Sequence, residues 1–167
     1  MIREIQAKTA LHKVNGPYPY RWDLNVYRGC GHQCCYCYAL YSHRYFSPSL
    51  QVQSDEFFKD IYVKKNIAEV LEKKLKSKNW QRLANKPVKE RTINLGGVTD
   101  SYQPLERKYK LLPRVWKALI KYRNPVCVLT KSDLILRDID LIKQLAETTT
   151  VYVGATITTV DEKKHKI

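Results

Sequence analysis

The chain has 167 residues, of which 44% are hydrophobic, and this composition suits one compact domain with its own core rather than a disordered tail. No apolar run approaches the length that a membrane-spanning helix needs. The formal net charge of +14 makes a polyanion such as nucleic acid a candidate partner, although a solvated lysine-rich surface would give the same charge. Many of the 12 tyrosines lie between Tyr18 and Tyr45, where they can stack on bases or shield a loop from water.

The N-terminal third of the chain predicts a leader, a strand and a helix. Residues 1–23 are expected to form a leader that packs on the domain, with a turn at 15–17. Residues 24–167 are expected to form the domain itself, and its first strand is predicted at 24–27. A helix is predicted over residues 60–76, because apolar residues recur there at steps of three and four with lysines on the opposite face.

Strands and helices alternate through the rest of the chain. The predicted elements are a strand at 92–95, a helix from Pro113 to Asn124, a strand at 126–129, a helix at 137–147 and a strand at 150–156. Such alternation predicts an α/β fold with parallel strands joined by right-handed crossovers. The strands are short apolar runs, as expected for a sheet that is covered on both faces. In sheets of this kind the chemistry lies at the carboxyl ends of the strands.

A cluster of cysteines follows the first predicted strand. Cys30, Cys34 and Cys37 have the spacing C-x3-C-x2-C. Three thiolates can hold three corners of an iron–sulfur cube, whereas electron-transfer clusters use four, so one iron would stay open to a substrate or cofactor. Cys35 falls outside the spacing and is expected to be a bystander, and Cys127 lies in an apolar run and is expected to be a buried strand residue.

The same cysteines could instead bind zinc or form disulfides. Zinc could be bound with the help of His32 and His43, although zinc ribbons have a second, separate C-x2-C pair that is missing here. Disulfides would suit a secreted chain, but residues 1–13 are charged and have no apolar core of the kind that a secretory signal has. Cysteines that serve as metal ligands must stay reduced, which predicts a cytoplasmic protein.

Three more segments follow predicted strands, at the edge of the sheet where a site is expected. They are Gly96-Gly97, Thr130–Ser132 and Thr156–Thr159. Glycines allow a backbone to approach a ligand closely, although a tight turn is a simpler reason for a glycine pair. Lys131 can neutralise a carboxylate as a point charge, although most lysines are simply solvated.

Several longer stretches carry a resemblance to a known family. They are Asn25-Val-Tyr-Arg-Gly-Cys30, Cys37-Tyr-Ala39, Gly96-Gly-Val-Thr-Asp-Ser-Tyr-Gln-Pro-Leu-Glu106, Thr130-Lys-Ser132 and Arg137-Asp138. With the cysteine spacing, they resemble the radical S-adenosylmethionine (SAM) enzymes, and within these the branch that includes spore photoproduct lyase. The resemblance runs along most of residues 22–160.

The resemblance implies a cofactor site. Cys30, Cys34 and Cys37 would ligate a 4Fe–4S cluster whose open iron is chelated by the amino and carboxylate groups of SAM. The remaining implied contacts are Tyr36 against the adenine, Gly96 and Gly97 at the methionine amino group, Lys131 at the carboxylate and Thr99 near the same end of SAM. A flavodoxin- or ferredoxin-like donor would supply the electron that cleaves SAM to methionine and a 5′-deoxyadenosyl radical, which abstracts hydrogen from a substrate.

The resemblance also implies a partial strand–helix barrel. Such domains usually carry about six strand–helix units, and only about four are predicted here. We therefore expect residues 24–167 to be the N-terminal part of a longer, truncated domain, with the residues that select the substrate in the missing C-terminal part.

At one position the chain departs from spore photoproduct lyase. That enzyme has a hydrogen-donating cysteine where this sequence has Gly97, so the same repair reaction is not expected here. A second function remains open, namely a non-catalytic zinc or iron–sulfur module that binds nucleic acid through its basic surface. The residues that separate the two functions are Gly96, Gly97 and Lys131, because a metal module has no reason to place them at strand ends.

Overall fold

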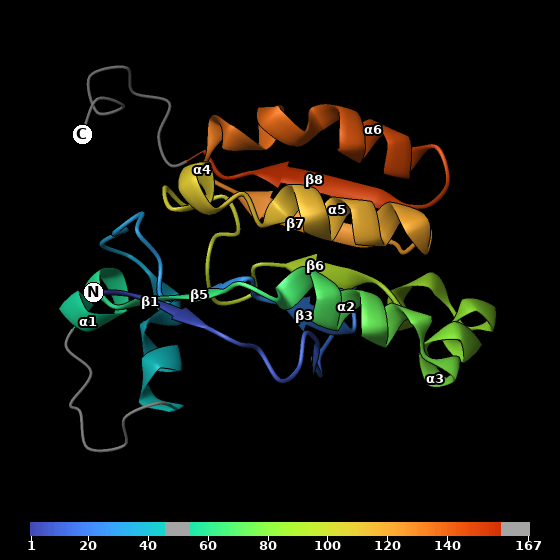
Figure 1. Ribbon diagram of the computed structural model, residues 1–167, viewed down its shortest axis with the longest axis horizontal. Helices are drawn as coiled ribbons and strands as arrows, with labels where there is room; N and C mark the ends of the chain where they lie inside the picture. The colour runs from blue at the N-terminus through green and yellow to red at the C-terminus, as the bar shows by residue number, and fades with distance from the viewer. Residues whose placement is uncertain (46–53, 158–167) are drawn as a thin grey trace.

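The computed structural model describes residues 1–45 and 54–157, which form a mixed α/β structure with two sheets (Figure 1). The larger sheet has the strand order β2-β3-β6-β7-β8. Its strands are β2 (His12–Lys13), β3 (Trp22–Leu24), β6 (Ile93–Leu95), β7 (Val126–Thr130) and β8 (Val151–Ala155). Strands β3, β6, β7 and β8 are parallel, as the alternating pattern predicts, and β2 is antiparallel to β3. Within the described residues the strands form no closed barrel.

The smaller sheet corrects two predictions. It has the order β1-β5-β4, with β1 (Ile2–Ile5) parallel and β4 (Tyr27–Arg28) antiparallel to β5 (Ile61–Lys64). The predicted helix at 60–76 is therefore wrong in its first turn, because Ile61–Lys64 forms a strand and the helix α2 is confined to Ile67–Lys76. The predicted strand at 24–27 is split, because the chain leaves one sheet after Leu24 and enters the other at Tyr27.

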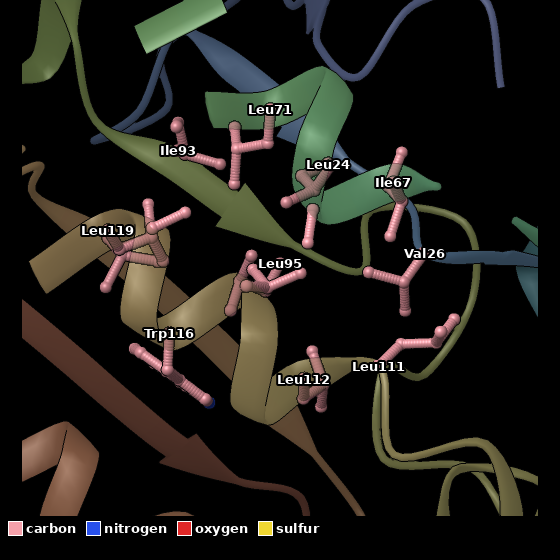
Figure 2. Close-up of a cluster of buried hydrophobic side chains, with 14 of the residues drawn as sticks. Leu24, Val26, Ile67, Leu71, Ile93, Leu95, Leu111, Leu112, Trp116 and Leu119 are labelled. Atoms are coloured by element: carbon pink, nitrogen blue, oxygen red, sulfur yellow. The ribbon is translucent and has the colours of Figure 1, made fainter. Parts of the chain in front are cut away.

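Three helices cover one face of the larger sheet and build the core with it. They are α2, α5 (Leu112–Lys121), with Pro113 in its first turn, and α6 (Ile139–Ala146), and they lie in a row in front of the sheet in Figure 1. Figure 2 shows Leu24, Ile93 and Leu95 of the strands packed against residues of the helices. The helix residues labelled there are Ile67, Leu71, Leu112, Trp116 and Leu119.

The opposite face of the larger sheet is not covered by a helix in the described ranges, which corrects the prediction of cover on both faces. Along β7 the residues alternate between buried Val126 and Val128 and more exposed Cys127 and Leu129, of which Leu129 is 58% exposed. Cys127 is thus in a strand as predicted, but it is only partly buried.

The remaining helices are short. They are η1 (Tyr38–Tyr45), α1 (Ser54–Lys59), α3 (Lys78–Gln81), η2 (Arg82–Asn85), η3 (Val88–Glu90), α4 (Glu106–Tyr109) and η4 (Asp133–Asp138). The helix predicted at 137–147 begins later, at Ile139, because η4 precedes it. The side chain of His43 and residues 158–159 lie outside the described part of the chain.

No helix of the described residues combines the length and the apolar character that crossing a bilayer requires.

Candidate functional site

A pocket of about 140 Å³, partly open to solvent, lies at the carboxyl ends of β6, β7 and β8. Its lining includes most of the residues that the sequence singled out, namely Cys30, Cys34, Tyr36, Cys37, Gly96, Thr99, Lys131 and Thr156. Cys35 and Gly97 do not line it. Apolar walls are supplied by Ala39, Phe57 and Val98.

The cysteine loop begins buried and becomes exposed along its length. Cys30 is 8% exposed, and its backbone N–H donates to the carbonyl oxygen of Phe57 at 3.2 Å. Cys37 N–H donates to Cys34 O at 3.1 Å, which closes a turn that leaves Cys35 exposed. All five cysteines are free thiols, and burial raises the pKa of Cys30 above its usual value.

In the described residues, no three Cys, His, Asp or Glu side chains are placed to share one metal ion. A cube does not require that arrangement, because each thiolate binds a different iron at its own corner. The donor set of three free thiols around one pocket therefore fits a cluster in number and chemistry.

The side chain of Gln103 holds the start of the cysteine loop. Fully buried, it donates from Nε2 to Gly29 O at 3.1 Å and accepts at Oε1 from Gly31 N–H at 2.9 Å. These two bonds bracket Cys30. Gly29 also accepts from Thr99 Oγ1 at 2.9 Å, and it has a φ of 78° with no room for a Cβ, which would lie 2.6 Å from Asp60 O. A side chain at position 29 would therefore displace the loop.

The carboxylate of Asp100 joins three segments at the edge of the pocket. Oδ1 accepts from Thr130 Oγ1 at 2.7 Å and from Tyr102 N–H at 2.9 Å, and Oδ2 accepts from Lys131 N–H at 2.9 Å. His32 Nε2 lies 3.2 Å from Oδ2, in ion-pair distance but without an aligned hydrogen bond. Burial alone would raise the pKa of Asp100, but His32 and the three donors outweigh it and lower that pKa.

A buried polar network continues behind the pocket from Glu106, which is fully buried. Its carboxylate accepts from Tyr27 Oη at 2.5 Å, from the N–H groups of Leu111 and Leu112 at 3.0 Å each, and from Arg137 at 2.8 Å. Every lone pair that burial removes from water is thus compensated by a donor.

Arg137 carries the network to α6 and α5. It donates to Asp138 Oδ2 at 2.7 Å, and that oxygen also accepts from Tyr102 Oη at 3.1 Å. Tyr102 in turn accepts from Trp116 Nε1 at 2.8 Å, and burial raises the pKa of Tyr102. Asp100, Gln103, Glu106, Arg137 and Asp138 were not singled out as site residues, although the stretches quoted for the family resemblance contain all of them.

The residues that the resemblance places around SAM differ in how open they are. Tyr36 is 58% exposed, and Lys131 Nζ lies 5.6 Å from the centroid of its ring. Gly96 has a φ of 92° and no room for a Cβ, which supports a requirement for glycine. The Thr99 hydroxyl donates to Gly29 O, and Gly97 packs against the carboxylate of Asp23, where a Cβ would collide.

Comparison with known proteins gives relatives without an established function. No family model and no solved structure matches the chain. An uncharacterized protein of Mycobacterium tuberculosis is 35% identical over 99% of this chain and 46% of its own length. An uncharacterized protein of Methanocaldococcus jannaschii is 30% identical over 93% of this chain and 51% of its own length. The chain therefore spans about half the length of the curated relatives that it matches.

Proposed function

We propose that the chain belongs to a radical SAM iron–sulfur enzyme of the branch that resembles spore photoproduct lyase. The observation that carries the proposal is the pocket, because Cys30, Cys34 and Cys37 line it together with Lys131, whereas Cys35 stays outside. The four parallel strands with helices on one face support the proposal, because a partial barrel is built from parallel strand–helix units. A zinc module would have no use for a lysine across the pocket from its thiolates.

In this proposal the three motif cysteines hold a 4Fe–4S cluster and the pocket binds SAM. The cofactors supply one-electron reductive cleavage of SAM, with an external flavodoxin- or ferredoxin-like donor, and so provide a radical that abstracts hydrogen from a substrate. The role of the protein is to position them. Lys131 supplies a positive charge for the SAM carboxylate, and Asp100 fixes the lysine's backbone through its N–H.

Residues around the pocket also limit access of water. Phe57 is fully buried and Ala39 is 4% exposed, and both line the pocket and belong to one apolar cluster with Cys30. The hydroxyl of Tyr38 donates to Gly97 O, which ties the segment after the cysteines to the end of β6. Water exclusion protects a reactive intermediate from side reactions.

Anaerobic reconstitution of the full chain with iron and sulfide tests the proposal. We expect about four irons per chain and negligible zinc, and deoxyadenosine should form when SAM and a reductant are added. Cys30→Ala should abolish both, whereas Cys35→Ala, the matched control, should leave both intact. Lys131→Ala should keep its iron but bind SAM roughly tenfold more weakly, as expected for a lost hydrogen bond to a charged group.

Stoichiometric zinc with no visible absorption band would refute the cluster and favour the alternative, a non-catalytic metal-binding module that binds nucleic acid. Equal loss of iron in Cys35→Ala and Cys34→Ala would refute the assignment of ligands.

A further inference from the structure

The smaller sheet has one buried face and one basic face. Strand register places Arg28 and Arg3 on either side of Tyr62, and it places Lys64 next to Tyr62 along the same face. The neighbours in the sequence that point the other way, including Tyr27 and Ile61, are core residues. We call Arg3, Arg28, Tyr62 and Lys64 the basic face.

Lys64 is a buried cation at the end of the central strand of this face. Its exposed fraction is 9%, and its Nζ donates to a neutral acceptor, Asn25 O, at 2.6 Å. Within the described ranges, no carboxylate forms an ion pair with it. Burial and the neighbouring Arg28 lower the pKa of Lys64 to about 8. A buried ammonium without a counter-charge is costly, and an anion from outside the chain would remove that cost.

A fourth basic residue, His12, lies close enough to the basic face to be affected by its charges. The pKa of His12 is lowered by burial, then by Lys64 and by Arg28. His12 is paired in register with Asp23 at the edge of the larger sheet, so the basic face adjoins the uncovered face of that sheet. Lys64 and Arg28 outweigh Asp23, which acts on His12 in the opposite direction, so positive charge prevails around this end of the basic face.

We propose that the basic face binds a phosphate of a nucleic-acid strand. Arginine can hold a phosphate through two parallel hydrogen bonds, and a lysine adds a point charge. A strand fits better than a free phosphate, because Arg3 lies over the ring of Tyr62 at 5.8 Å and so brings an aromatic side chain among the cations. The net charge of +14 favours a polyanion further.

The position of this face connects it to the pocket. Arg28 precedes Cys30 by two residues, and Lys64 is bonded to Asn25, which itself accepts from Val98 N–H at 3.0 Å beside the pocket. A strand anchored here would therefore reach the pocket with an adjoining nucleotide. The inference deepens the proposed function. Binding of the strand does not depend on that function, but the assignment of the strand as substrate does.

Fluorescence anisotropy with a labelled single-stranded oligonucleotide tests the inference on the apoprotein, without iron or SAM. Lys64→Met should weaken binding about tenfold, and it should reduce the slope of log affinity against log salt by roughly one phosphate contact. Lys65→Met is the matched control, because Lys65 is adjacent, half-exposed and paired with Glu4 at 3.0 Å, and it should change binding little. Arg3→Gln, at an exposed member of the face, should weaken binding without a risk to folding.

Two outcomes would overturn the inference. Equal losses in Lys64→Met and Lys65→Met would mean that only diffuse surface charge binds the strand. Binding of inorganic phosphate that depends on Lys64, with no oligonucleotide binding, would assign the site to a free anion. Because none of these measurements needs the cluster, a failure here is distinguishable from failure of the proposed function, which iron content and deoxyadenosine formation report.

Discussion

Replacing Lys64 by methionine should stabilise the chain at neutral pH and lose that advantage in alkali. Folding lowers the pKa of this lysine from 10.5 to about 8, a difference of 10.5 − 8 = 2.5 units. At roughly 1.4 kcal/mol per unit, the buried charge costs about 3.5 kcal/mol. Methionine removes this cost but also removes the bond to Asn25 O, which costs roughly 1 kcal/mol, so the net gain is about 2.5 kcal/mol.

The sign of the pH dependence follows from proton binding. Between pH 8 and pH 10.5 the unfolded chain holds more protons at this position than the folded chain does, so the free energy of unfolding rises with pH in that window. Below pH 8 the full cost is present. The advantage of Lys64→Met should therefore be greatest at neutral pH, and it should vanish and then reverse slightly as the pH approaches 10.5, because the lost bond to Asn25 O remains.

Urea unfolding of the apoprotein and of Lys64→Met, at neutral pH and near the upper end of the window, measures this difference. Tyrosines and cysteines also titrate in alkali, but they are common to both proteins and cancel in the comparison. Lys65→Met, which removes an exposed charge, should show no such trend. A stability difference that does not change with pH would show that Lys64 is not a buried cation, and it would remove the main support for the phosphate site.

Two further substitutions test the polar network that holds the pocket. Gln103→Leu leaves Gly31 N–H without its partner, so it should cost about 2 kcal/mol of unfolding free energy and speed alkylation of Cys30 in the apoprotein, and an unchanged alkylation rate would refute the clamp. Glu106→Gln leaves Asp138 as the one carboxylate paired with Arg137 in the described residues and puts an amide NH2 among donors that need an acceptor, so it should cost about 1–3 kcal/mol by urea unfolding. Asp133→Asn, which breaks an exposed ion pair, should cost less than about 1 kcal/mol, and similar costs for the two would contradict the network's importance.

The sequence predicts the larger sheet well because its signals are local. Short runs rich in β-branched residues and amphipathic helices alternate from residue 92 onward, and each element can be identified without its neighbours. The error at 61–64 has the same origin, because Ile61 and Val63 continue the apolar spacing of α2. What makes this segment a strand is its pairing with Ile2–Ile5, and no local pattern reveals a partner nearly 60 residues away.

In the candidate site, too, residues with a local sequence signal were predicted, and residues whose role depends on distant partners were not. The three motif cysteines can be recognised because their spacing is itself the signal, and they do line one pocket. The role of Gln103 could not be predicted, because it depends on backbone atoms of Gly29 and Gly31, which are more than 70 residues away. A buried glutamine predicts hydrogen bonds but not their partners.

The network also separates the proposed ligand residues from the residues that hold their segments in place. One run of eight residues, 99–106, contacts three other segments. Gln103 holds the cysteine loop, Asp100 holds the Lys131 segment, and Glu106 accepts from Arg137 at the end of η4, just before α6. The side chains of Gln103 and Glu106 are fully buried, so a partner lost there leaves a polar group that water reaches poorly, whereas the bond from Lys131 N–H to Asp100 is exposed. Changes at Gln103 should therefore move the cysteines relative to Lys131, whereas changes at Asp100 should move Lys131 relative to the cysteines, although neither side chain is a proposed ligand.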